Sequence, residues 1–239
     1  MRKLYVLPFD HRGSFAKMFG LAHGKLAVGD SAKLSDYKHV IYEGFLAALK
    51  LGICKEDAAI LVDEEFGSKI QEEARESDIA RILTVEKSGQ DEFDFEYGDK
   101  FGEHINKFKP EYVKALVRYN PKNDKEMNRR QVGRLKTLGG FCEKNGYKFL
   151  IELLAAPTEK QLEECGGKEE YEKNLHWDVM RRSIAGMKAG GADPDVWKLE
   201  GLESREQFAA VVEEALRHSS GQATYANKEV GVIVLGRGE

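Results

Sequence analysis

The sequence predicts an α/β fold, a (β/α)8 barrel of the TIM type, and two observations carry this prediction. Seven short apolar segments alternate with longer amphipathic ones along the 239 residues, which indicates parallel strands joined by helical crossovers. Nearly every apolar segment is followed at once by charged or polar residues. In a barrel these strand ends converge on one mouth, where the active site lies, whereas an open doubly wound sheet spreads them along an edge.

The predicted strands cover residues 4–9, 58–62, 81–85, 112–117, 149–154, 196–199 and 230–235. Helical periodicity predicts helices at residues 36–51, 125–145, 170–189 and 204–218. The sequence ends directly after the seventh predicted strand. We therefore expect residues 1–239 to form a single barrel domain that is truncated at its C-terminus and lacks the eighth strand and the last helices.

Composition limits the partners and the compartment. A net charge of −4 without a basic stripe argues against nucleic-acid binding. No apolar run approaches the roughly 18 residues that a membrane span needs, and the N-terminal apolar stretch is too short for a signal peptide. The three cysteines match no zinc or redox spacing, which is typical of reduced thiols. We expect a cytoplasmic protein with neither a membrane nor a nucleic acid as partner.

Lys198 is the most informative residue, because it lies in an otherwise apolar strand. Strand alternation places it on one face with Val196 and Glu200, and opposite Trp197. If Trp197 packs against the helices, Lys198 points into the barrel, where burial disfavours its charged form. A neutral amine is the nucleophile of Schiff-base chemistry. A structural lysine paired with a carboxylate of a neighbouring strand is the alternative, and the spacing alone favours neither.

Two further charged residues lie within predicted strands. Glu152 is in the middle of its strand, where an unpaired carboxylate is costly, so Lys198 on the adjacent strand is its natural partner. The pair is either structural or a proton shuttle for a carbinolamine. Lys114 shares a strand face with Arg118, and a second inward lysine would activate the first by repulsion. Lys114 could instead reach solvent from its place near the start of the strand.

Acidic residues end the first two strands. Asp10 could orient a lysine or bind a substrate hydroxyl, although a helix cap or a loop carboxylate is a serious alternative. The acidic run 63–65 could hold a metal, but no histidine follows at ligand spacing. We therefore expect neither a metal nor another cofactor.

Phosphate-binding candidates also follow strands. Gly236, Arg237 and Gly238 come after the seventh strand, a position where barrels often bind phosphate, and arginine binds phosphate in a bidentate manner. The other candidates for binding the substrate or its phosphate are Lys87, Ser88, Arg12 and Arg118. His104, His176 and His218 lie away from strand ends and are expected at the surface. The sequence contains no recognisable catalytic triad, Walker loop or dinucleotide-binding turn.

Taken together, six segments resemble the class I aldolases of the tagatose-1,6-bisphosphate type. They resemble more closely the aldolase-like domain fused to 5-dehydro-2-deoxygluconokinase in bacterial inositol breakdown. The segments occur in family order and extend over almost the whole chain. They are residues 7–14, 62–67, 86–89, 113–116, 151–153 and 196–200.

This resemblance implies a barrel, a homo-oligomer and a metal-independent lyase of carbohydrate metabolism. It implies that Lys198 forms the Schiff base, that Glu152 is the acid and base, and that Asp10 and Lys114 support them. The expected substrate is a phosphorylated keto sugar or keto sugar acid, cleaved to dihydroxyacetone phosphate and an aldehyde. In that family a further glycine–arginine phosphate site follows an eighth strand.

Two other functions are compatible with the same residues. A metal-independent sugar-phosphate isomerase or epimerase would use the carboxylates without an imine, and the fold alone does not separate the two activities. A non-catalytic domain that binds a sugar phosphate and partners a kinase would bind its ligand without turnover.

Overall fold

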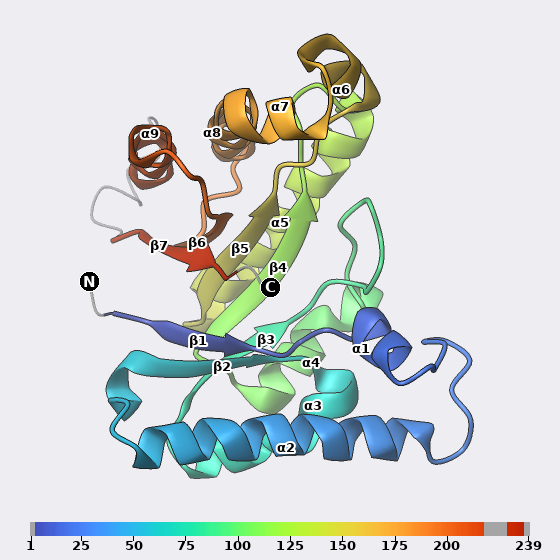
Figure 1. Ribbon diagram of the computed structural model, residues 1–239. Helices are drawn as coiled ribbons and strands as arrows, with labels where there is room; N and C mark the ends of the chain where they lie inside the picture. The colour runs from blue at the N-terminus through green and yellow to red at the C-terminus, as the bar shows by residue number, and fades with distance from the viewer. Residues whose placement is uncertain (1–2, 218–228, 237–239) are drawn as a thin grey trace. The chain divides into compact units, whose positions relative to one another are not determined.

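The computed structural model describes residues 3–217 and 229–236. In this part of the chain seven strands form one sheet in the order β1 to β7, so the order in space follows the order in sequence (Figure 1). The pairings between these strands are parallel. A doubly wound sheet reverses its order at a switch point. The uninterrupted order and the alternation with helices confirm the predicted TIM-barrel-like α/β fold class.

The observed strand ends agree with the predicted ones to within one residue. This agreement follows from the composition of the segments, because strands covered on both faces are nearly continuous apolar runs. All five residues of β2 are buried, for example. The strands are β1 (Tyr5–Pro8), β2 (Ala58–Val62), β3 (Ala80–Thr84), β4 (Tyr112–Arg118), β5 (Lys148–Leu154), β6 (Val196–Glu200) and β7 (Gly231–Leu235).

The helices alternate with these strands. They are α1 (Gly13–Met18), α2 (Asp30–Lys50), α3 (Glu64–Glu76), α4 (Phe101–Phe108), α5 (Lys125–Asn145), α6 (Glu159–Cys165), α7 (Lys168–Asn174), α8 (His176–Ala189) and α9 (Arg205–Leu216). Two short 3-10 helices, η1 (Lys55–Asp57) and η2 (Gly98–Lys100), precede β2 and α4. No helix in the described part of the chain has the length and apolar character of a membrane span.

Local signals explain where one predicted helix begins and ends, whereas a second predicted helix is divided in two. The helix predicted at residues 125–145 is α5: the Asp124 carboxylate accepts a hydrogen bond from the Met127 amide, and Gly146 follows with φ 75°. The single helix predicted at residues 170–189 is wrong, because two helices, α7 and α8, meet at Leu175. The apolar periodicity continues across this junction, so sequence spacing did not reveal it.

The chain divides into two compact units. The first contains Met1–Gln90 and Phe95–Lys114, and the second contains Asp91–Asp94 and Ala115–Glu239. Residues 112–114 of β4 belong to the first unit and residues 115–118 to the second.

In the first unit, α2 and α3 cover one face of the strands (Figure 1). The core between them joins side chains from β2, α2 and α3 with Phe9, which follows β1, and Ile79, which precedes β3. Its buried members are Phe9, Tyr42, Phe45, Ala58, Ile60, Val62, Ile70, Ala74 and Ile79.

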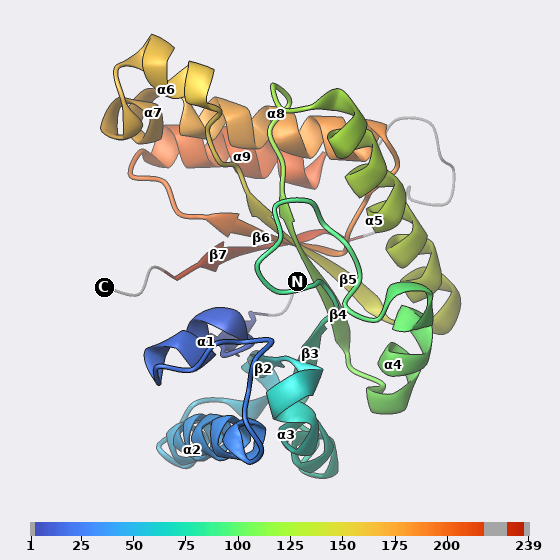
Figure 2. The same ribbon diagram turned by 90° about the vertical axis from the view of Figure 1, so that its right-hand side faces the viewer.

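In the second unit, α8 and α9 lie side by side next to β6 and β7 (Figure 2). Lys188 of α8 links the two helices by hydrogen bonds. Its ammonium donates to the carbonyl oxygens of Glu214, Ala215 and Arg217 at the C-terminal end of α9, at 2.9, 2.6 and 2.5 Å. A cation at this end satisfies carbonyls that have no partner within the helix.

The close approach of α3 to β2 gives a test of the packing. A Cβ at Gly67 would lie 2.2 Å from Val62 Cγ2, so we expect Gly67→Ala to lower the free energy of unfolding by about 1–3 kcal/mol. Gly44 in α2 is the matched control, because nothing lies within 4 Å of its Cβ position. Gly44→Ala should stabilise the protein by up to about 1 kcal/mol. Urea unfolding measures both variants, and equal effects of the same sign would contradict this packing.

Candidate active site

Lys198 and Glu152 form a buried ion pair in the second unit. The pairing of β5 with β6 places the two residues directly opposite each other, and Lys198 Nζ lies 2.9 Å from Glu152 Oε1. Each residue is only 5% exposed. The structure therefore brings together the two residues that the sequence analysis placed at the centre of the site, and it leaves a proton donor and a proton acceptor in direct contact.

The other face of these two strands is buried as well. Trp197 and Leu199 alternate with Lys198 along β6, and Ile151 and Leu153 alternate with Glu152 along β5; all four are fully buried, and alternation turns them to the opposite face. A lysine as deeply buried as Lys198 requires a partner of opposite charge. Because the strand register fixes which residues are opposite, the register selects Glu152 as the partner of Lys198.

Glu200 and His176 extend this region of the second unit. Glu200 Oε2 accepts a hydrogen bond from the Ala155 amide at 3.1 Å and lies 3.1 Å from His176 Nε2. His176 is only 2% exposed, so its predicted surface position is wrong. Its place at the start of α8 turns the imidazole toward Glu200 at the end of β6. The spacing of histidines in the sequence does not predict this tertiary contact.

Of the other two histidines, the structure describes only His104. His104 is partly exposed, with Nδ1 2.7 Å from Glu64 Oε2, and its ring stacks on Tyr97. His218 lies outside the described residues.

Lys114 is the centre of a second charged group, in the first unit. Its ammonium donates to Asp10 Oδ2 at 2.9 Å and to Glu86 Oε1 at 2.7 Å, and it lies 3.4 Å from Thr84 Oγ1. Lys114 is 1% exposed, so the alternative that it reaches solvent is wrong. Asp10 is thus a partner of a buried lysine, which is one of the roles that the sequence left open for it. Glu86 was not predicted as a site residue, although it follows Thr84 by two residues and strand alternation places both on one face.

Arg12 lies beside this group and makes its contacts within the protein. Its guanidinium donates to Glu96 Oε2 at 2.7 Å and to the Glu86 carbonyl oxygen at 2.5 Å. Burial by itself would raise the pKa of Glu86, but the positive charges of Lys114 and Arg12 outweigh it and hold the pKa below its usual value. Arg12 therefore pairs with Glu96 and adds positive charge beside Glu86.

A third buried pair in the first unit joins Lys38 of α2 to Asp63, which follows β2. The lysine ammonium donates to Asp63 Oδ2, while Oδ1 accepts from the Phe66 amide and caps α3. Burial lowers the pKa of Lys38 and raises the pKa of Asp63. Lys38 was missed in the sequence because a lysine in an amphipathic helix is ordinarily a solvated one.

The three acids of the run 63–65 contact different lysine and histidine side chains. Asp63 binds Lys38, Glu64 lies against His104 and Lys107, and Glu65 lies 2.8 Å from His23. Among the described residues, no three His, Cys, Asp or Glu side chains form a group that could hold a metal ion.

The phosphate-binding candidates are only partly described. Gly236 is exposed after β7 and has open space at its Cβ position, whereas Arg237 and Gly238 lie outside the described residues. Ser88 Oγ accepts from the Gly13 amide at 3.3 Å in the first unit. Lys87, in the first unit, and Arg118, in the second, are both partly exposed.

The loop predicted at residues 88–102 is anchored by side chains. Phe93 and Phe95 are buried, and Phe95 stacks on Phe101 in the first unit. In the second unit, Glu92 binds Arg130 and Arg134, which lowers the pKa of Glu92 to about 2. The segment is therefore more than a plain solvated loop.

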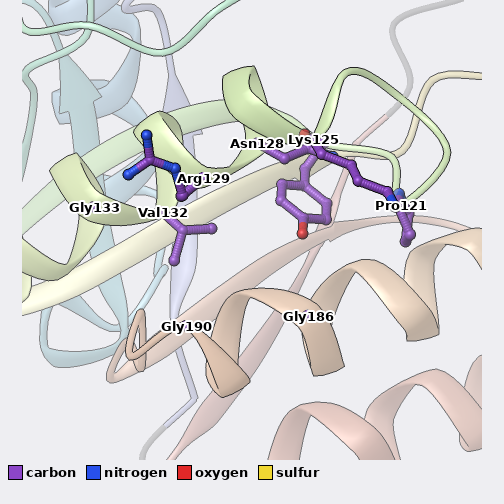
Figure 3. Close-up of a pocket in the computed structure, with 9 residues that line it drawn as sticks. Pro121, Lys125, Asn128, Arg129, Val132, Gly133, Gly186 and Gly190 are labelled. Atoms are coloured by element: carbon purple, nitrogen blue, oxygen red, sulfur yellow. The ribbon is translucent and has the colours of Figure 1, made fainter.

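A groove of about 470 Å³ lies between α5 and α8 (Figure 3). Lys125, Asn128 and Val132 line it from α5, and Gly186 lines it from α8. It contains none of the predicted site residues, so we do not assign it to the candidate active site.

Comparison with known proteins gives a family and a fold. A family model described as "Uncharacterized protein conserved in bacteria (DUF2090)" matches residues 1–238. No curated protein matches the sequence. Among solved structures, Cgl0159 from Corynebacterium glutamicum (Brevibacterium flavum) is similar with a TM-score of 0.57 and 13% identity, over 97% of this chain and 77% of that one.

A structure of a Schiff-base-forming fructose-1,6-bisphosphate aldolase is also similar. Its TM-score is 0.50 and its identity 11%, over 97% of this chain and 86% of that one. At such low identities the similarity shows the fold alone. The chain has an aldolase-like barrel fold, and its chemistry has to be argued from its own residues.

The Lys38–Asp63 pair yields a thermodynamic prediction. Asp63→Asn keeps an oxygen to cap α3 but removes the charge opposite Lys38, so we expect it to cost about 3–5 kcal/mol of unfolding free energy. Replacing both residues, in Lys38→Met/Asp63→Asn, should recover most of that loss, because no charge is then left buried. Denaturant unfolding of the single and double variants measures the coupling. Simple addition of the two single effects would show that the pair is not a coupled unit.

Proposed function

The chain belongs to the DUF2090 family, and we propose that it is a class I aldolase that cleaves a phosphorylated keto sugar through an imine on Lys198. The observation that carries the proposal is the buried contact of 2.9 Å between Lys198 Nζ and Glu152 Oε1. An imine-forming lysine needs a neighbour that accepts its proton and later returns it. The aldolase-like fold and the resemblance of six sequence segments to class I aldolases support the same chemistry.

Glu152 has two tasks in this mechanism. It first accepts a proton from the Lys198 ammonium, which frees the amine to attack the substrate ketone and form a carbinolamine. It then donates that proton to the carbinolamine hydroxyl, which leaves as water and produces the iminium. The positively charged nitrogen accepts the electron pair of the breaking carbon–carbon bond. An aldehyde departs, and protonation and hydrolysis of the remaining enamine release dihydroxyacetone phosphate.

The proposed substrates are ketoses or keto sugar acids with a phosphate on the carbon next to the ketone. 2-Deoxy-5-keto-gluconate 6-phosphate, tagatose 1,6-bisphosphate and fructose 1,6-bisphosphate all meet this description. We propose that the phosphate binds to backbone amides at Gly236 and Gly238 and to the Arg237 guanidinium, with Lys87, Ser88 and Arg118 as further candidates. Asp10 and Lys114 are proposed as supporting residues, and the protein as a homo-oligomer without a metal or another cofactor.

The defining experiment is borohydride trapping with dihydroxyacetone phosphate. We expect one irreversible adduct, located on Lys198 by peptide mapping, and no adduct in Lys198→Met. Lys188→Met is the matched control, because that lysine is also buried in the second unit but donates to helix carbonyls. An adduct on a different lysine would overturn the assigned nucleophile. No adduct on the folded protein would favour a sugar-phosphate isomerase or a binding domain that partners a kinase.

The role of Glu152 is tested separately. Glu152→Gln leaves Lys198 beside a neutral amide that neither accepts nor returns a proton, so we expect imine formation to slow by about 10²–10⁴-fold. The rate of adduct formation in rapid-quench trapping measures this step. A rate within a few-fold of the wild type would mean that Glu152 is only the structural counter-charge of Lys198.

A further inference from the structure

Glu172, His176 and Glu200 form a connected group in the second unit, which we call the carboxylate–imidazole group. His176 Nε2 lies 3.1 Å from Glu200 Oε2. On the other side of the ring, Nδ1 lies 2.9 Å from Glu172 Oε2, outside hydrogen-bond geometry. The histidine is buried, whereas the side chains of Glu172 and Glu200 are 39% and 25% exposed. A buried imidazole thus separates two carboxylates that both reach the surface of this unit.

The Glu200 carboxylate is fixed in orientation by two donors on one oxygen. The Ala155 amide and His176 Nε2 both approach Oε2. Because a carboxylate is only an acceptor, the proton of this second contact is carried by Nε2. The Ala155 peptide is itself held, since the hydroxyl of the buried Tyr171 donates to its carbonyl oxygen at 2.7 Å. The rotation of the Glu200 carboxylate is therefore set by β5, α7 and α8 together.

Glu200 also stands close to the reacting lysine along the strand. It follows Lys198 by two residues in β6, so the two side chains emerge on the same face. Just beyond it, Gly201, Leu202 and Ser204 line a cavity of about 600 Å³ that is also lined by Glu172. Along β6, Lys198 therefore comes first, and Glu200 follows two residues nearer to the carboxyl end of the strand. The Glu200 carboxylate is partly exposed, and the residues that follow it line the cavity.

Resting on the proposed aldolase function, we propose that Glu200 is the base for carbon–carbon cleavage and that His176 is its positioning residue. Glu152 is occupied with the carbinolamine at the lysine nitrogen. Cleavage needs a second proton acceptor, at the hydroxyl on the carbon that becomes the aldehyde. Glu200 lies on the same face as Lys198 and nearer to the carboxyl end of β6, the end of the strands at which barrels place their active sites.

In the cleavage step, Glu200 takes the proton of the hydroxyl on the carbon that becomes the aldehyde. The oxygen of this hydroxyl then forms the carbonyl of the aldehyde. The bond between this carbon and its neighbour next to the iminium breaks, and its electron pair neutralises the iminium to give the enamine. In the direction of synthesis, Glu200 returns the same proton to the aldehyde oxygen as the bond forms. No oxidant, reductant or metal takes part.

The experiment separates bond making from imine formation by using two probes. Dihydroxyacetone phosphate alone reports imine formation by borohydride trapping and enamine formation by exchange of its carbon-bound hydrogen in D₂O. Addition of glyceraldehyde 3-phosphate reports formation of the carbon–carbon bond. We expect Glu200→Gln to keep trapping and exchange within about 3-fold of the wild type but to slow bond formation by about 10²–10⁴-fold. Glu213→Gln, an exposed change on α9 of the same unit, is the matched control and should leave all three rates unchanged.

Variants of His176 test the positioning role. His176→Leu removes the donor to Glu200 and should slow bond formation by about 10²-fold, the effect typical of a misplaced catalytic group. His176→Gln retains an N–H donor and should recover most of that loss. Trapping on Lys198 in each variant shows that the site is folded, and a structural defect alone would lower trapping and bond formation in parallel.

The outcomes distinguish this inference from the function on which it rests. Normal bond formation in Glu200→Gln, or parallel loss of trapping and bond formation in His176→Leu, overturns the inference and leaves the imine intact. A wild-type protein that traps dihydroxyacetone phosphate on Lys198 but joins it to no aldehyde overturns it as well. Absence of trapping in the wild type overturns the proposed aldolase function itself.

Discussion

The cost of burying a lysine inside a parallel sheet is the constraint on which the site depends. An ammonium removed from water has to be compensated by an anion at contact distance. For Lys198 the compensation comes from Glu152, at the opposite position of the neighbouring strand. A shift of one residue in this register would place Ile151 or Leu153 opposite the lysine and turn the carboxylate to the other face. The pairing of β5 with β6 and the chemistry of the site are therefore fixed by the same hydrogen bonds.

The first unit meets the same constraint with a larger group of charges. Lys114 contacts two carboxylates, Asp10 and Glu86, and Arg12 adds a second positive charge next to Glu86. The lowered pKa of Glu86 shows that the cations outweigh the burial of its carboxyl group. Lys38 and Asp63 form a separate pair for which burial dominates, because their pKa values move toward the neutral forms. Both sets of residues are buried, so their different pKa shifts follow from the different numbers of neighbouring charges.

Sequence reasoning located the strands and the residues at their ends, because both depend on local patterns. Apolar runs mark buried strands, and alternation assigns Glu152 and Lys198 to particular faces. The missed features depend on contacts between elements that are distant in sequence. Lys38 belongs to an amphipathic helix and becomes buried only because α2 packs beside Asp63. His176 begins a helix whose predicted start was wrong, and its contact with Glu200 requires α8 to be placed against the end of β6.

The different surroundings of the two lysines bear on which of them is the nucleophile. Two carboxylates at 2.9 and 2.7 Å and a hydroxyl at 3.4 Å surround the Lys114 ammonium. Lys198 has one carboxylate, Glu152, within contact distance among the ion pairs of the described residues. Transfer of a single proton within that pair leaves a neutral amine and a neutral acid. The same transfer from Lys114 would leave a second carboxylate beside a neutral amine, and this difference supports our proposal that Lys198 is the nucleophile.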